Sequence, residues 1–274
     1  MTIHFHPNNE SEASRAFSRQ APSFDHLYAR DPIVTYKRQR VRSHLMRYLS
    51  PGSHILELNA GTGEDAVFLA RQGHSVHATD ISAQMQKILA SKVKNHHLED
   101  LVTYERCSFT QLGQLKNKGP YDLIFSNFAG LNCTNNLPEV LDSLGSLLKP
   151  GGMITLVLLP GFCLWESLLV FKGKFRTAFR RLAGPKGATA HIEGVLFRCW
   201  YYRPRPIIRQ LARSYYLLNT EGLCSFVPPS YMVGFTTRWP RLYRWLVGLE
   251  SRFKSKWPWK FIGDYMILTF VAKR

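Results

Sequence analysis

The sequence has few cysteines and no long hydrophobic run, and both shortages narrow what the protein can be. Its 274 residues include five cysteines, which lie at least 25 residues apart and form no Cys-x-x-Cys pair. This spacing excludes a disulfide-stapled scaffold, predicts no metal site and indicates a reducing compartment. No uncharged stretch exceeds 16 residues, whereas a membrane-spanning helix needs about 20 mostly apolar ones, so we expect none. The first residues lack the basic-then-apolar order of a signal peptide, so we expect a cytoplasmic protein, at most peripheral to a membrane.

Acidic residues are scarce in the C-terminal part of the chain. Residues 1–160 hold 16 Lys+Arg and 14 Asp+Glu, whereas residues 161–274 hold 20 Lys+Arg and 5 Asp+Glu. The formal net charge of +17 therefore divides into +2 and +15. A surface of one sign attracts anions, so we expect an anionic partner: a membrane surface, a phosphate-bearing ligand or, less readily, RNA. The alternative is a solvated face that only keeps the protein in solution.

Between His54 and Pro160, short apolar runs alternate with helical stretches, which is typical of βαβ units in a parallel sheet. The predicted strands are His54–Asn59, Ser75–Thr79, Val102–Cys107, Tyr121–Ser126 and Met153–Leu159. The predicted helices lie near Glu64–Gln72, Ala83–Lys94 and Leu137–Leu148.

The regions before and after this core have a different pattern of predicted helices and strands. Residues 12–49 predict two amphipathic helices, broken at Pro22 and Pro32, and residues 161–198 form a basic, aromatic insertion. Beyond it we expect a strand at 197–202, a helix from Pro204 or Pro206, a strand at 216–227, helical structure over 230–256 and a closing strand at 265–271. Leu242–Phe253 and the apolar residues of 162–182 form two stripes, which either pack on the sheet or face a membrane.

A glycine-containing turn follows the first predicted strand. Residues 57–65 read Glu-Leu-Asn-Ala-Gly-Thr-Gly-Glu-Asp, and glycines at 61 and 63 let a ligand approach the backbone at a helix N-terminus. Asp80 ends the second strand, 17 residues after Gly63, where a carboxylate can accept both hydroxyls of a ribose.

Glu57–Gly63 resembles the first motif of the class I S-adenosylmethionine-dependent methyltransferases, acid-x-Gly-x-Gly-x-Gly, with Asn59 in place of the first glycine. Asn is the residue that best replaces glycine at left-handed backbone angles, so the turn can form. Asp80 is similar to the ribose-binding acid of this family. The stretch 106–109 is similar to its adenine-binding segment, in which many members have Asp where this chain has Ser108.

Three further segments resemble the same family: residues 121–128 its fourth motif, residues 148–152 the turn before strand five, and residues 16–28 the lid of the quinone-pathway and biotin-pathway members. The resemblance implies an α/β, doubly wound, mostly parallel seven-stranded sheet with the last strand antiparallel, an N-terminal helical lid, and helical insertions after strands five and six. The expected parts are a lid (1–50), a cofactor-binding core (51–160), a basic aromatic cap (161–203) and a C-terminal part of the sheet (204–274) with a helical insertion at 229–262.

The resemblance implies S-adenosylmethionine as cofactor. The residues expected to bind it are Tyr28, Glu57, Asn59, Ala60, Gly61, Thr62, Gly63, Asp80, Ile81, Met85, Ser108, Phe109, Asn127 and Phe128. A nicotinamide-dinucleotide fold is the rival, but its third glycine would stand where this chain has Ala66. A cofactor-binding protein without catalysis is a further alternative.

Residues 126–129 read Ser-Asn-Phe-Ala, whereas base-modifying N-methyltransferases of this class have Asn/Asp-Pro-Pro-aromatic there. We therefore expect methyl transfer to an O or C atom of a small, lipophilic acceptor that is anionic or held at a membrane. The alternative is an RNA methyltransferase that uses the basic half. His191 is a candidate base or a surface histidine, and Glu166 either contacts substrate or pairs with a nearby lysine.

Overall fold

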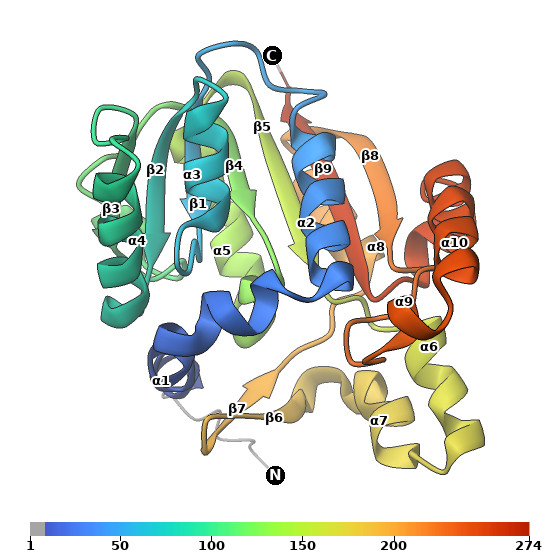
Figure 1. Ribbon diagram of the computed structural model, residues 1–274. Helices are drawn as coiled ribbons and strands as arrows, with labels where there is room; N and C mark the ends of the chain where they lie inside the picture. The colour runs from blue at the N-terminus through green and yellow to red at the C-terminus, as the bar shows by residue number, and fades with distance from the viewer. Residues whose placement is uncertain (1–8, 274) are drawn as a thin grey trace, which may run out of the picture.

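The computed structural model describes residues 9–273, and a twisted sheet runs through the middle of this range (Figure 1). Within it, seven strands follow the spatial order β3-β2-β1-β4-β5-β9-β8. They are β1 (His54–Leu58), β2 (Ser75–Asp80), β3 (Val102–Arg106), β4 (Tyr121–Ser126), β5 (Leu148–Leu158), β8 (Tyr215–Leu223) and β9 (Tyr265–Ala272). Strands β1 to β5 are parallel, and β9 is antiparallel to both β5 and β8. The expected mostly parallel sheet with its last strand antiparallel is confirmed.

Helices cover both faces of the sheet because successive strand residues point to opposite sides. On one face, α2 (Pro32–Leu45), α3 (Glu64–Arg71) and α4 (Ala83–Asn95) pack against Ile55, Val76 and Phe125. On the other face, α5 (Leu137–Ser143) and α8 (Pro204–Leu211) pack against Leu56, Ile124 and neighbouring residues. Figure 1 shows α2 and α3 in front of the strands and α5 and α8 behind them. The doubly wound arrangement leaves the carboxyl ends of the parallel strands open for a ligand.

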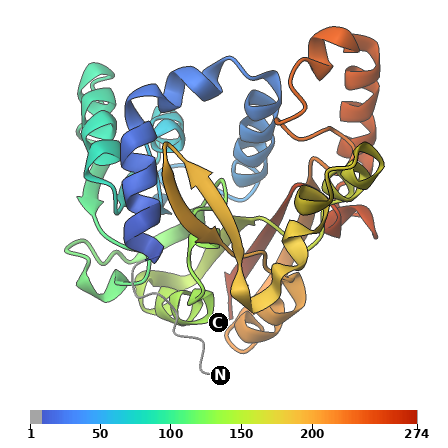
Figure 2. The ribbon, with the colours of Figure 1, turned by 90° about the horizontal axis from the view of Figure 1, so that it is seen from below.

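The N-terminal segment corrects one expectation. Helix α1 (Asn9–Ala29) continues through Pro22 instead of breaking there, and the helix bends in Figure 2. A proline inside a helix removes one backbone hydrogen bond and bends the helix, which does not have to end. The break at Pro32 is confirmed, since Pro32 opens α2 and the Asp31 side chain accepts hydrogen bonds from the next two free backbone N–H groups. Residues 1–8 of the expected lid lie outside the described residues.

The region after β5 corrects two more expectations. It contains α6 (Leu164–Ser167), α7 (Phe175–Phe179) and a hairpin of β6 (Ala188–Ile192) and β7 (Val195–Cys199) that stands apart from the main sheet. The strand expected at 197–202 thus ends at Cys199 as part of this hairpin, which packs along α1 (Figure 2). The helical stretch expected at 230–256 divides into α9 (Phe235–Arg238) and α10 (Pro240–Phe253). Two residues of the apolar stripe expected over Leu242–Phe253, Leu242 and Trp245, are 40% and 60% exposed.

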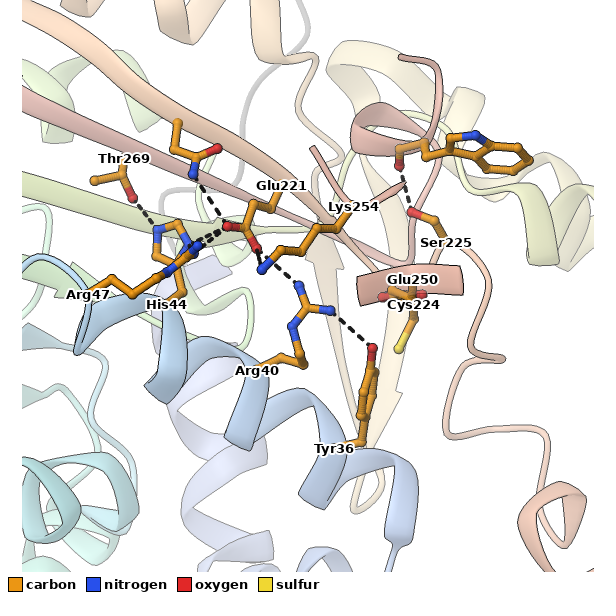
Figure 3. A network of polar contacts seen from close by, with 12 residues as sticks. Tyr36, Arg40, His44, Arg47, Glu221, Cys224, Ser225, Glu250, Lys254 and Thr269 are labelled. Atoms are coloured by element: carbon orange, nitrogen blue, oxygen red, sulfur yellow. Dashed lines mark hydrogen bonds and ion pairs between the residues drawn. The ribbon is translucent and has the colours of Figure 1, made fainter. Parts of the chain in front are cut away.

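A buried ionic network fastens α2 to β8 (Figure 3). The Glu221 carboxylate is fully buried, and its two oxygens accept hydrogen bonds from Arg40, Arg47 and His44 of the N-terminal region. Lys254 completes the set, with its Nζ 3.0 Å from Glu221 Oε2. Burial raises the pKa of Glu221, but the hydrogen bonds from His44 and Arg47 and the neighbouring positive charges outweigh burial and hold it well below its usual range. Ion pairs and hydrogen bonds therefore connect α2 to β8, two segments that lie about 180 residues apart in the chain.

Candidate functional site

The glycine-containing turn lies between β1 and α3, at the carboxyl edge of the sheet. Asn59, Gly61 and Gly63 all have left-handed backbone angles, with φ of +48°, +57° and +78°. The Ala60 N–H donates to Thr79 O at 2.9 Å, which ties the turn to the end of β2. Asn59 therefore adopts the conformation that the missing glycine would supply, as expected from the sequence.

The Asn59 side chain also joins two strands. Its Nδ2 donates to Asn127 O at 2.9 Å, and its Oδ1 accepts from Ser126 Oγ at 2.7 Å. The amide thus bridges the ends of β1 and β4. A Cβ at Gly130 would come within 2.2 Å of Asn59 Cγ, so the asparagine requires a glycine there.

Asp80 holds the turn from the neighbouring strand. Its Oδ2 accepts from the Gly61 N–H at 2.9 Å, and its Oδ1 accepts from the Ser82 N–H at 2.8 Å. Burial raises the pKa of Asp80, and these two hydrogen bonds lower it in part. A carboxylate has about four lone-pair sites, so Asp80 retains acceptors for a ligand.

Two adjoining hollows border this turn and share Phe17, Phe24, Asn59, Gly61, Asn127 and Phe128. The first extends past Asp80 to the apolar side chains of Ile81, Met85 and Phe109. The second reaches Tyr28, Glu57, Ala60 and Thr62. Twelve of the fourteen expected cofactor residues thus line these two adjoining hollows.

The other two, Gly63 and Ser108, lie behind the walls of the hollows. A Cβ at Gly63 would come within 2.6 Å of Leu89 Cγ, so this glycine allows α3 and α4 to approach each other. The Ser108 hydroxyl donates to the Glu10 carboxylate, and Glu10 lines the first hollow.

Neither candidate catalytic residue borders the hollows. His191 is exposed on the outer side of the hairpin, whereas its neighbour Ile192 lines the second hollow. Glu166 is buried and accepts hydrogen bonds from Arg180 and Arg181. Burial raises the pKa of Glu166, but these two guanidinium groups dominate and lower it. Glu166 therefore pairs with arginines rather than with a lysine, and the geometry favours a catalytic role for neither residue.

A carboxyl group and a guanidinium group face the second hollow without a full set of partners. Glu57 is buried, its Oε2 has no hydrogen-bond partner, and burial, followed by the charge of Asp65, raises its pKa well above the usual range. Arg38 lies over the Phe128 ring, with its Cζ 5.4 Å from the ring centroid, and its Nε has no hydrogen-bond partner. Its ion pair with Glu64 is long, at 3.7 Å. A carboxylate without a partner can bind the ammonium of an amino-acid group, and a guanidinium with free N–H donors can bind its carboxylate.

The sequence-based prediction missed Arg38, along with Glu10, Lys37 and Tyr265, which also line the hollows. No motif marks these positions. Which residues of α1 and α2 face the cavity depends on how the helices are rotated when they pack. The hydrophobic pattern of α2 is weak because Lys37 and His44 are buried along with its apolar residues.

Comparison with known proteins agrees with this geometry. Residues 55–152 match the family model described as "Methyltransferase domain". A demethylmenaquinone methyltransferase of Leptospira interrogans is 30% identical over 41% of this chain and 47% of its own length, so the chain spans about half of that relative. A malonyl-[acyl-carrier protein] O-methyltransferase of Pectobacterium atrosepticum is 25% identical over 80% of this chain and 74% of its own.

Among solved structures, the [4+2]-cyclase SpnF superposes with a TM-score of 0.64, covering 99% of this chain and 98% of its own at 14% identity. At this identity the likeness establishes the fold. The family resemblance seen in the sequence is confirmed, and with it the cofactor class. Residues 55–152 match a methyltransferase domain, within a chain that shares its fold with solved S-adenosylmethionine-dependent methyltransferases.

Proposed function

We propose that the chain transfers a methyl group from S-adenosylmethionine to an O or C atom of a small, lipophilic acceptor. The observation that carries this proposal is the order of groups along the cavity. An apolar end is followed by Asp80, and then by the carboxyl group of Glu57 and the guanidinium of Arg38. A base, a ribose and an amino-acid group follow one another in the same order in the cofactor.

The residues present fit each part of that cofactor. Ile81, Met85 and Phe109 offer apolar surface for the base, and Asp80 retains acceptor sites for the ribose hydroxyls. Glu57 and Arg38 would take the ammonium and the carboxylate. When bound, S-adenosylmethionine supplies an activated methyl group, so the protein's task is to position the acceptor and exclude water.

The space between the two hollows suits an apolar acceptor. Phe17, Phe24 and Phe128 are shared by both hollows, and Tyr28 and Tyr265 line the second. Burial raises the pKa of Tyr265 to about 12, although the charge of Lys37 opposes the rise. This phenol therefore stays protonated at neutral pH, where it can donate a hydrogen bond to an acceptor oxygen but cannot act as a base.

The contacts of Asn127 favour O or C acceptors over amines. Its Nδ2 donates to Asp65 Oδ2 at 2.7 Å, and its Oδ1 accepts from the Phe128 N–H at 2.8 Å. The amide oxygen that would accept a hydrogen bond from an amino group thus has one of its two lone-pair sites occupied by the chain's own backbone.

The surface of the C-terminal half supports an anionic, membrane-held partner. Of the five acids in residues 161–274, all but Glu193 are buried, so few negative charges offset the basic residues on this surface. Exposed apolar side chains lie among the basic ones: Phe171, Phe175, Phe179 and Leu182 alternate with Lys172, Lys174 and Arg176, and Phe171 is 85% exposed. We propose that this cap face, residues 162–182, contacts an anionic membrane from the cytoplasmic side. No helix in the described range 9–273 has the length and apolar character to cross a membrane.

Radiolabelled methyl transfer tests the reaction. Purified protein is incubated with labelled S-adenosylmethionine and either a lipid extract or an RNA fraction, and label is expected in the lipid extract. Label in RNA would favour the alternative acceptor class. Binding of S-adenosylhomocysteine without transfer to either fraction would favour a cofactor-binding protein with other chemistry.

Vesicle sedimentation tests the cap face. Binding to anionic vesicles is expected to fall as salt is raised, and Phe171→Ser with Phe175→Ser is expected to weaken it. Tyr104→Ser is the matched control, because Tyr104 is an exposed aromatic on β3 at the opposite edge of the sheet. Equal binding to neutral and anionic vesicles, or none, would contradict the membrane proposal.

A further inference from the structure

The adenine end of the cavity has a carboxylate that the sequence did not predict. Residue 108, where relatives often have Asp, is Ser108 here, which left the recognition of the base unexplained. The structure places Glu10, from the first turn of α1, against this position. Ser108 Oγ donates to Glu10 Oε1, and Thr110 Oγ1 donates to Glu10 Oε2 at 2.9 Å.

Glu10 also faces the ligand space. It lines the first hollow together with Asp80, Ile81 and Phe109, which are the residues expected beside the ribose and base. The two hydroxyl groups fix the position of the carboxylate and occupy one lone-pair site on each oxygen, so acceptor capacity remains. Ser108 is in turn held by Thr110, whose N–H donates to Ser108 Oγ at 3.0 Å.

We propose that Glu10 accepts a hydrogen bond from the exocyclic amino group of adenine and so selects the base, with Ser108 and Thr110 as positioning residues. This inference rests on the proposed function, because it assumes that the cavity binds an adenosyl cofactor. The carboxylate that many relatives have on the loop after strand three is here supplied by the N-terminal helix of the same chain.

Selection of the adenine base then depends on how α1 is held against the rest of the protein. Ser18 of α1 lies 2.7 Å from Ser82, Oγ to Oγ. Thr62 Oγ1 donates to Asp25 Oδ1 at 2.7 Å, and Lys92 pairs with the same carboxylate group. These contacts place α1 over the hollow, so adenine meets its carboxylate only when the helix is closed on the site.

The test compares the affinities of two ligands by calorimetry in the full chain. S-adenosylhomocysteine carries the exocyclic amino group, whereas S-inosylhomocysteine has a carbonyl oxygen at that position. The wild type is expected to prefer the adenine compound by about 10- to 100-fold, the range for one hydrogen bond to a charged group. Glu10→Gln is expected to reduce this ratio to near one, because its amide can donate to the carbonyl oxygen as readily as it accepts from the amino group.

Two further variants separate recognition from structure. Glu12→Gln alters a neighbouring acid that pairs with Arg15 on the same helix, and it should leave the ratio unchanged. The double variant Glu10→Ala, Ser108→Asp moves the carboxylate to the relatives' position and should restore the preference. A ratio that survives in Glu10→Gln would overturn the inference alone. Failure of the wild type to bind S-adenosylhomocysteine would overturn the proposed function and the inference with it.

Discussion

Buried carboxylates have different surroundings in the two halves of the molecule. In the C-terminal half, both oxygens of Glu166, Glu221, Glu250 and Asp264 accept hydrogen bonds from the chain itself. In the cofactor half, the equally buried Glu57 has an oxygen with no partner, and that carboxylate faces the cavity. Burying a carboxylate without a partner costs several kcal/mol, so the unpartnered oxygen of Glu57 indicates a ligand, whereas a carboxylate that has partners on both oxygens and lines neither hollow indicates a structural role. Substitutions in the first group should therefore change stability, and substitutions in the second should change binding.

The largest expected effect is on stability, from Glu221→Gln. Removing the charge leaves Arg40, Arg47 and Lys254 together without their counter-ion. We expect the free energy of unfolding to fall by about 3–5 kcal/mol, measured by denaturant titration. The affinity of the folded variant for S-adenosylhomocysteine should be unchanged.

The stabilising effect of Glu221 should depend on pH. The pKa of Glu221 is lower in the folded protein than in the unfolded chain, so its stabilising effect is complete above the unfolded value of about 4.3 and is lost as pH falls below it. The gap between wild type and variant should thus narrow in acid. Glu193→Gln, the exposed acid of the same half, should change stability by less than about 0.5 kcal/mol. A similar loss in both variants would contradict the distinction between paired and exposed acids.

The next largest effect is on binding, from Asp80→Ala. Two charge-assisted hydrogen bonds to the ribose would be lost, so the affinity for S-adenosylhomocysteine should fall by at least about 100-fold in calorimetry. Asp80 also accepts from two backbone N–H groups, so the melting temperature is measured alongside. Asp100→Ala, at an exposed acid that precedes β3 and lines neither hollow, should bind normally. Undiminished binding in Asp80→Ala would place the ligand elsewhere.

Glu57 should make binding depend on pH. Burial and the nearby Asp65 raise the pKa of Glu57 in the free protein, and the ammonium of the ligand favours its ionised form. Affinity for S-adenosylhomocysteine should therefore rise with pH, by at most about tenfold per unit below that pKa, with release of a proton on binding. Calorimetry in buffers of different ionisation enthalpy measures the number of protons released on binding. Glu57→Gln should bind more weakly and lose this dependence, and the same slope in both proteins would assign the proton to another group.

The same two halves differ in how far the sequence predicts them. Short strand-like runs predict β1 to β5; β1 leads into the glycine turn and β2 ends at Asp80, so the turn and this acid are placed correctly. The hairpin at 188–199 was not foreseen as a separate sheet, because its short strands pack on α1 and not on the core. The apolar residues of α10 fall on several faces, and those that pack inward are Tyr243, Leu246 and Val247. The spacing of apolar residues within a segment does not show which distant helix or strand that segment will contact.

The smallest effect concerns Asn59, whose backbone angle is costly for any residue with a Cβ. Asn59→Gly loses the two hydrogen bonds to Ser126 and Asn127 but removes the strain, whereas Asn59→Ala loses the bonds and keeps it. We expect the alanine variant to be less stable than the glycine variant by about 1 kcal/mol.

Gly130 provides an independent check on the same contact. All three of the nearest atoms to a Cβ at Gly130 belong to Asn59, so Gly130→Ala should destabilise the wild type more than it destabilises Asn59→Gly. A double-mutant cycle of unfolding free energies measures this coupling. Additive effects would mean that the asparagine amide does not occupy the space beside Gly130. Residues 59 and 130 could then be substituted independently, and the asparagine bridge between β1 and β4 would not be the reason that residue 130 is a glycine.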